Sequence, residues 1–209
     1  MVPHLEFGGG NPVISPFRIE GFTNNRPFNE KGIPVTDVAF NWGFLNGVPT
    51  TQSISPLVGD ISNPQLSTDI IGQNITGDTT FTLTASDGVA TRRARTAVLF
   101  YYPIFYGSVS GIMPTEAEIL SMNKHVAGFA GFTASINVSD RHSCFVSPMT
   151  NPIKDIREPL FNLSILSTYI IYDNFFITMA DGLLVPCRVL VKAVPEHTLG
   201  QNMDLVIEF

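Results

Sequence analysis

Residues 79–107 read TTFTLTASDGVATRRARTAVLFYYPIFYG. From Phe81 to Ala85, apolar residues alternate with threonine, the period-two pattern of a strand with one buried face. Asp87-Gly88 then predicts a two-residue turn, because both central positions of a type I′ turn need positive φ. The stretch therefore predicts a β-hairpin whose return strand becomes apolar towards residue 100.

The return strand ends in aromatic residues, and a proline interrupts them. These aromatic residues are Tyr101, Tyr102, Phe105 and Tyr106, with Pro103 between the two pairs. Proline cannot donate a hydrogen bond to a neighbouring strand, so a central strand does not easily continue through it. We therefore expect one domain to end near residue 102 and a second to begin near residue 108.

The first domain is predicted as an immunoglobulin-like β-sandwich over residues 17–102, because short strands recur at the spacing of that fold. The expected strands are 17–22, 35–45, about 51–55, 67–72, 79–86 and 89–100. Trp42 lies on the apolar face of the second of these strands. Its simplest role is the large residue at the centre of the core, and the alternative is an exposed ring that stacks on sugar.

The second domain is predicted as another β-sandwich, over residues 108–209, that carries one helix near 114–125. Acidic residues near the start of this helix and Lys124 and His125 near its end suit the helix dipole. The expected strands of this domain are 132–138, 143–148, 169–172, 175–179, 184–194 and 203–209. Asp181-Gly182 marks a second hairpin.

Composition limits the function classes. Charged residues make up 14% of the chain, against about a quarter in soluble domains. The apolar surplus must be buried in cores or in contacts with other subunits. The net charge is −6 and no basic run of five or more residues occurs, so we expect no nucleic-acid partner. We find no secretory signal and no apolar run of the ~20 residues that a membrane helix needs.

No motif indicates catalysis, a metal or a cofactor. The four histidines lie far apart, without the short spacing of metal ligands. Residues 140–144 place Asp, Arg, His, Ser and Cys side by side, but neighbours in an extended strand point to opposite faces. The two cysteines, Cys144 and Cys187, are expected to be reduced thiols in strands. We therefore expect a protein that is not an enzyme.

Residues 1–16 form a separate segment, with three adjacent glycines and three prolines. It is either a disordered start or an extended N-terminal arm that orders against a neighbouring subunit. Apolar residues such as Leu5, Phe7 and Ile14 favour the arm. A chain with such an arm and few charges is expected to form a homo-oligomer.

The order of these features resembles virion proteins of tailed bacteriophages, in particular tail, baseplate and fibre-associated components. One part that carries the resemblance is the threonine-rich strand before Asp87-Gly88 and the aromatic end at Gly107. The other is the second half, where an aromatic start, a Pro-Thr helix and an apolar strand to Pro148 lead to strands that end at Phe209. After Pro148 the sequence reads Met-Thr-Asn-Pro, where the family pattern has a Tyr-Gly turn.

The resemblance implies a structural component of the virion, assembled in the host cytoplasm, in the tail, the baseplate or a fibre attachment. It implies other virion proteins as partners, three- or six-fold symmetry, and no cofactor. The alternatives are a receptor- or carbohydrate-binding module that contacts a host surface glycan, and a capsid decoration or head-fibre protein. The candidate subunit or receptor contacts are Tyr101, Tyr102, Phe105, Tyr106 and Tyr172.

Overall fold

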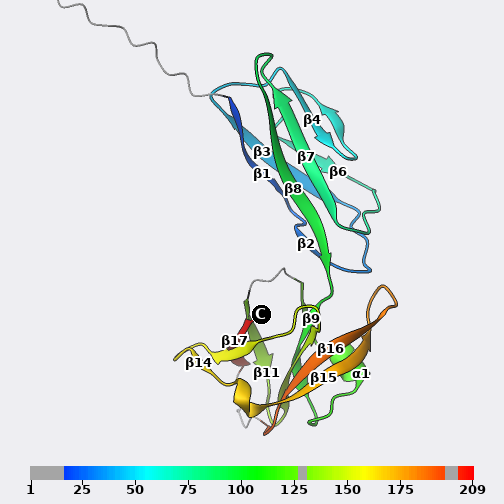
Figure 1. Cartoon of the computed structure of the whole chain (residues 1–209), viewed down its shortest axis with the longest axis vertical. Coiled ribbons are helices and arrows are strands. Elements are labelled where there is room, and N and C mark those ends of the chain that lie inside the picture. The colour runs from blue at the N-terminus through cyan, green and yellow to red at the C-terminus, as the bar shows by residue number, and fades with distance from the viewer. Residues whose placement is uncertain (1–16, 127–130, 196–201) are drawn as a thin grey trace, which may run out of the picture. The chain divides into compact units, whose positions relative to one another are not determined.

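The computed structural model describes residues 17–126, 131–195 and 202–209. In these residues the protein is mainly β, as predicted: seventeen strands form four sheets, beside one α-helix and one 3-10 turn (Figure 1). The predicted arm at 1–16 lies outside the described residues. No helix in the described part of the chain is both long and apolar enough to cross a membrane.

The chain divides into two compact units. The first contains the described residues up to Asn25, then Asp37–Gly72 and Thr80–Ala97. The second contains Arg26–Thr36, Gln73–Thr79 and the chain from Val98 onward. Two segments from the first half of the sequence therefore belong to the second unit, which a division by sequence position alone does not anticipate.

Two sheets build the first half of the chain. One has the order β1-β3-β6, with β1 (Arg18–Asn24), β3 (Val38–Leu45) and β6 (Ser67–Ile70). The other has the order β2-β8-β7-β4-β5, with β2 (Phe28–Glu30), β8 (Thr91–Tyr101), β7 (Thr79–Ser86), β4 (Thr51–Ser55) and β5 (Gly59–Ile61). The rings of Phe40 and Phe81 lie 4.8 Å apart between centroids and join the two sheets. The short strands β2 and β5 were not predicted, because neither has an alternating apolar pattern.

Trp42 is buried in the core of the first unit, with 6% of its surface exposed. Its indole N–H donates to Oε1 of Gln52 at 3.1 Å, and Gln52 Nε2 donates to two backbone oxygens of residues 62 and 65. The indole N–H of Trp42 is thus hydrogen-bonded to a glutamine side chain that is itself buried. This excludes Trp42 as an exposed sugar-stacking ring.

The turn between β7 and β8 is displaced by one residue from the predicted Asp87-Gly88 position. The Asp87 N–H donates to Ala90 O, so Gly88 and Val89 are the central residues, and Asp87 Oδ1 accepts from the N–H groups of Val89 and Ala90. Only Gly88 has positive φ, at 89°. These hydrogen bonds to the Asp87 side chain hold the backbone of the turn, so a second residue with positive φ is not needed. These backbone bonds lower the pKa of Asp87.

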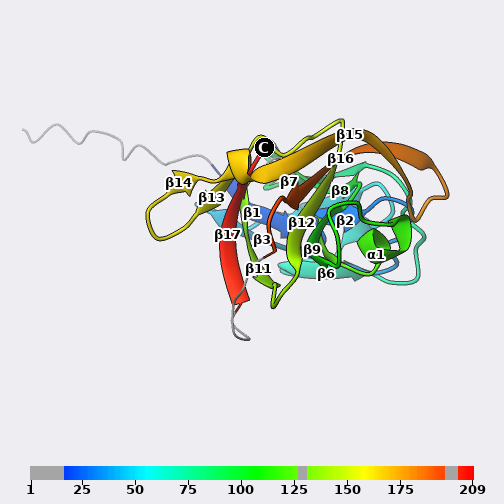
Figure 2. The same cartoon turned by 90° about the horizontal axis from the view of Figure 1, so that it is seen from below.

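The second unit contains the other two sheets. The five-stranded sheet has the order β10-β9-β12-β16-β15, with β10 (Asn123–His125), β9 (Ile104–Val109), β12 (His142–Pro148), β16 (Leu184–Lys192) and β15 (Tyr169–Thr178). The four-stranded sheet has the order β11-β17-β13-β14, with β11 (Phe132–Asn137), β17 (Asn202–Glu208), β13 (Asp155–Glu158) and β14 (Leu163–Ser164). In Figure 2, β17 lies between β11 and β13. The 3-10 turn η1 (Leu166–Thr168) precedes β15.

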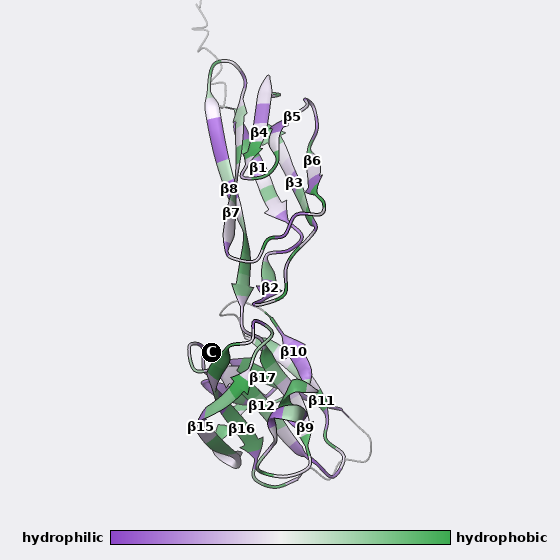
Figure 3. Cartoon of the chain, turned by 90° about the vertical axis from the view of Figure 1, so that its right-hand side faces the viewer, coloured by the Kyte–Doolittle hydropathy of each residue, from purple (hydrophilic) through white to green (hydrophobic). Residues whose placement is uncertain are grey.

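The inner strands β12 and β16 of the five-stranded sheet are largely buried on both faces. One face packs on the four-stranded sheet through Ile104, Phe145 and Leu190. The other face forms a separate core with Phe105, Cys144, Val146, Val189 and Val191, covered in part by Ile119 of the helix. Strands buried on both faces tend to be apolar throughout rather than alternating, and β16 is predominantly hydrophobic in Figure 3. β12 is also buried along its whole length, but it includes the buried polar residues His142, Ser143 and Ser147. Burial raises the pKa of the Cys187 thiol to about 12 and also raises that of Cys144.

The helix α1 (Glu116–Leu120) is shorter than the predicted 114–125. It begins with a capping box, in which Thr115 accepts from the Glu118 N–H and Glu118 accepts from the Thr115 N–H. It ends at Ser121 because residues 123–125 pair as strand β10 with residues 104–106 of β9.

Replacing Glu118 by glutamine is expected to remove a pH-dependent contribution to stability. Hydrogen bonds from the Thr115 backbone, the Ser110 hydroxyl and the Thr115 hydroxyl hold the pKa of Glu118 at about 2, below its ordinary 4.5. Because this pKa is lowered in the folded protein, the contribution is complete above pH 4.5 and is lost as the pH falls towards 2. At pH 7 we expect a loss of about 1 kcal/mol, as for other capping residues.

Urea unfolding of both proteins between pH 7 and pH 2.5 measures this effect. The difference in the free energy of unfolding between wild type and Glu118→Gln should become smaller as the pH falls from 4.5 towards 2.5. Glu20→Gln removes an exposed carboxylate of β1 and serves as the control. A difference that stays constant with pH would show that the charge of Glu118 adds nothing to its capping role.

Candidate functional site

The five aromatic residues predicted as contacts do not form one exposed surface. Phe105 is buried, and the four tyrosines are half-buried. The Tyr102 hydroxyl donates to Asp181 Oδ2 at 2.9 Å, and Lys31 Nζ lies 4.7 Å from the centre of the Tyr102 ring. Burial and then the bond to Asp181 raise the pKa of Tyr102. Its contacts lie within the second unit.

The other three tyrosines also have packing partners. The Tyr106 ring lies 5.5 Å from that of Phe132, and the Tyr101 ring lies 6.0 Å from that of Phe28. Tyr172 packs against the core on the helix side of the five-stranded sheet. A flat, exposed aromatic platform for a sugar ring is therefore not built from these five residues.

The residues at 140–144 do not form a catalytic group. His142 Nδ1 lies 2.7 Å from the backbone oxygen of Lys192, and the Ser143 hydroxyl lies 2.8 Å from the Tyr169 hydroxyl. Cys144 points into the core on the opposite face of the sheet from Tyr169. Among the described residues, no group of three or more His, Cys, Asp or Glu side chains could hold a metal ion.

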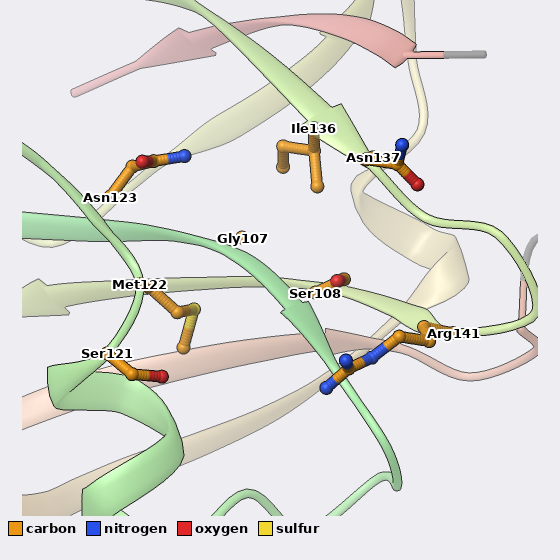
Figure 4. Close-up of a pocket in the computed structure, with 8 residues that line it drawn as sticks. All are labelled: Gly107, Ser108, Ser121, Met122, Asn123, Ile136, Asn137 and Arg141. Atoms are coloured by element: carbon orange, nitrogen blue, oxygen red, sulfur yellow. The ribbon is translucent and has the colours of Figure 1, made fainter. Parts of the chain in front are cut away.

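A pocket of about 300 Å³ opens on the second unit beside β9 (Figure 4). Its lining consists of Gly107, Ser108, Ser121, Met122, Asn123, Ile136, Asn137 and Arg141. The pocket exists because β10 pairs with β9 only as far as Tyr106, so the edge of β9 from Gly107 onward is not covered by that strand. The neighbouring wall comes from the end of β11, which belongs to the other sheet.

The lining of this pocket is polar and carries one charged side chain, Arg141. Within the described part of the chain, the Arg141 guanidinium has no ion pair or hydrogen bond and is exposed. Amides of Asn123 and Asn137 and hydroxyls of Ser108 and Ser121 accompany it, and no carboxylate lines the pocket. Such a site can hold a ligand by hydrogen bonding, but it has no paired nucleophile and base.

An exposed apolar turn is the second notable feature of the second unit. Residues 159–163, which run from the end of β13 to the first residue of β14, form what we call the Leu160 turn; the exposed fractions of Leu160, Phe161 and Leu163 are 77%, 71% and 62%. Both oxygens of the Glu158 carboxylate accept backbone N–H groups of this turn, at 2.9 and 2.8 Å. The turn is therefore held in one conformation while its apolar side chains face solvent.

Neither feature was predicted from the sequence. The pocket residues come from four separate segments and carry no spacing motif. The Leu160 turn lies in a stretch that was interpreted as a loop as far as Leu160. The signal available there was the run Pro-Leu-Phe-Asn-Leu, which is unusually apolar for a turn. No family model, curated protein or solved structure matches this chain.

Proposed function

We propose that this chain is a structural subunit of a tailed-bacteriophage virion, located in the tail or baseplate region or at a fibre attachment. It acts through assembly with copies of itself and with other virion proteins, in three- or six-fold rings, rather than through catalysis. The family resemblance of the sequence and its mainly β build support the proposal. The first unit would be the immunoglobulin-like module of such a protein.

The observation that carries the assembly role is the Leu160 turn. Large apolar side chains are normally exposed singly, whereas here three lie within four residues. The hydrogen bonds of Glu158 fix the backbone beneath two of them. A turn that is already ordered loses little conformational entropy on binding, so more of the burial free energy contributes to affinity. Burying one Phe or Leu side chain contributes about 1.5–3 kcal/mol.

Replacing Phe161 by aspartate is expected to weaken self-association, with a dissociation constant raised at least about tenfold. Sedimentation velocity over a range of protein concentrations measures this change. Val89→Asp is the matched control, because Val89 is 96% exposed in the turn between β7 and β8 of the first unit. A wild-type chain that stays monomeric at all concentrations, or a Phe161 variant that associates normally, would contradict a self-assembly role for this turn.

The virion assignment needs its own test. Particles purified from the phage that encodes this sequence should contain the chain at a fixed copy number by quantitative mass spectrometry. Gold-labelled antibodies against the second unit should bind the tail or baseplate in electron micrographs. Detection of the chain only in the soluble fraction of the lysate, and not in particles, would rule out the structural role.

A further inference from the structure

We propose that the pocket around Arg141 binds a sugar residue that carries a carboxylate, such as a uronic or sialic acid. The inference is independent of the assembly role proposed above, since the pocket and the Leu160 turn share no residue. None of the five aromatic residues predicted as contacts lines this pocket.

The charge of the pocket selects the carboxylate. Arg141 is its only charged lining residue, and an arginine presents five N–H donors in a planar fork that matches a carboxylate. Charge-assisted bonds of this kind are about twice as strong as neutral ones. The net charge of −6 on the whole chain does not cancel this preference, because salt screens exposed charges beyond about 8 Å at physiological ionic strength.

The remaining lining favours a polyhydroxylated ligand over a simple anion. The amides of Asn123 and Asn137 and the hydroxyl of Ser108 can each donate and accept, which suits sugar hydroxyls. The Ser121 hydroxyl donates to Glu118 O at 2.7 Å, so towards a ligand it can only accept. The half-buried Met122 adds apolar surface for the carbon face of a ring. At about 300 Å³ the pocket lies at the lower end of ligand sites, which fits one ring rather than a long chain.

The local backbone fixes the position of Arg141. Its N–H donates to Val138 O at 2.7 Å in a turn where Asp140 has φ of 52°. The next residue, His142, begins β12 and pairs with Val109 of β9. In Figure 4 the Arg141 side chain extends from this turn past the end of β9, on the other side of Ser108 from Ile136 and Asn137.

Gly107 keeps the floor of the pocket open. A Cβ at this position would lie 3.0 Å from Met122 Cγ and 3.2 Å from its Sδ. Any larger residue at 107 would therefore displace Met122 or occupy part of the pocket. The volume of the pocket depends on a glycine with an ordinary backbone conformation, since its φ lies outside the positive range.

Titration of the ¹⁵N-labelled full chain, followed by NMR chemical shifts, tests the proposal. The probes are glucuronate, galacturonate and N-acetylneuraminate, with glucose and galactose as neutral sugars and with acetate and phosphate as simple anions. We expect the acidic sugars to shift the amide signals of Gly107, Ser108, Asn123 and Asn137. Neutral sugars and simple anions should bind at least about tenfold more weakly, because each lacks one part of the recognised chemistry.

Two arginine variants complete the experiment. Arg141→Gln should weaken binding of the acidic sugar at least about tenfold, while the melting temperature stays unchanged because the side chain is exposed and unpartnered among the described residues. Arg93→Gln makes the same charge change at an exposed position on β8 in the first unit and should bind normally.

Three results would overturn the inference. The first is the absence of shifts at the pocket with every acidic sugar. The second is equal binding of acetate or phosphate, which would make the pocket a simple anion site. The third is unchanged binding by Arg141→Gln. Self-association is measured on the same samples, so that a failure of sugar binding can be told apart from a failure of the assembly proposal.

Discussion

Replacing Phe145 by alanine is expected to lower the free energy of unfolding of the second unit by about 3–5 kcal/mol, the usual cost of a buried phenylalanine cavity. Phe145 has no exposed surface and lies between the two sheets of this unit, with its ring 6.0 Å from that of Tyr169. Neighbours on both adjacent strands hold the backbone of β12, so the cavity cannot close by a local shift.

The chain contains separate reporters for its two units. Trp42 is the only tryptophan and lies in the first unit, so its fluorescence follows the unfolding of that unit. Both cysteines lie buried in the second unit, and their reaction with a thiol reagent in urea reports its unfolding. Phe145→Ala should therefore expose the thiols at lower urea concentration.

Phe176→Ala provides the matched control for this prediction. Phe176 lies on the edge strand β15 of the same sheet, with 53% of its surface exposed. Its removal should cost about 1 kcal/mol, well below the cost of Phe145→Ala, because only about half of its surface leaves water on folding and no enclosed cavity remains. Equal costs for the two variants would mean that the core between the sheets contributes less than its burial implies.

The parts of the fold that the sequence predicted are those with a clear period of two. From Phe81 to Ala85 the alternation is strict, and β7 has the predicted bounds, Thr79–Ser86. The mainly β class follows from such strands. The helix was predicted too long because Asn123–His125 can join either a helix or a strand, and only the available edge of β9 decides between them.

The two surface features could not be predicted because they depend on tertiary neighbours. Arg141 is one of several exposed arginines in the sequence, and only the end of β10 and the position of β11 place a pocket beside it. The aromatic residues around Pro103 were interpreted as contacts because their packing partners, Phe132 and Asp181, are remote in sequence.

Gly32 is another residue whose role depends on a neighbour that is remote in sequence. It lies among residues 26–34, whose glycine and prolines are typical of a loop. In the structure this segment belongs to the second unit and packs on the turn that includes Asp181. Lys31 beside it covers the Tyr102 ring, whose hydroxyl bonds the same aspartate. A glycine is needed here for both backbone conformation and space.

Replacing Gly32 by alanine is expected to destabilise the second unit by about 2–5 kcal/mol, the sum of a left-handed backbone and an overpacked contact. Its φ is 94°, and an added Cβ would clash with the Asp181 nitrogen and lie 2.6 Å from the carbonyl carbon of Ala180. Because these are backbone atoms, no side-chain rotation relieves the clash.

The control variant for Gly32 lies in the turn it contacts. Gly182 has φ of 78° and nothing within 4 Å of an added Cβ, so Gly182→Ala carries the backbone cost of about 1–2 kcal/mol without the clash. Thiol labelling in urea should show the second unit to be most stable in wild type, less stable in Gly182→Ala and least stable in Gly32→Ala. The urea dependence of Trp42 fluorescence, which reports on the first unit, should change little. If the two variants lost the same stability, the close approach of Gly32 to residues 180–181 would carry no steric cost, and the loop could leave the turn without weakening the unit.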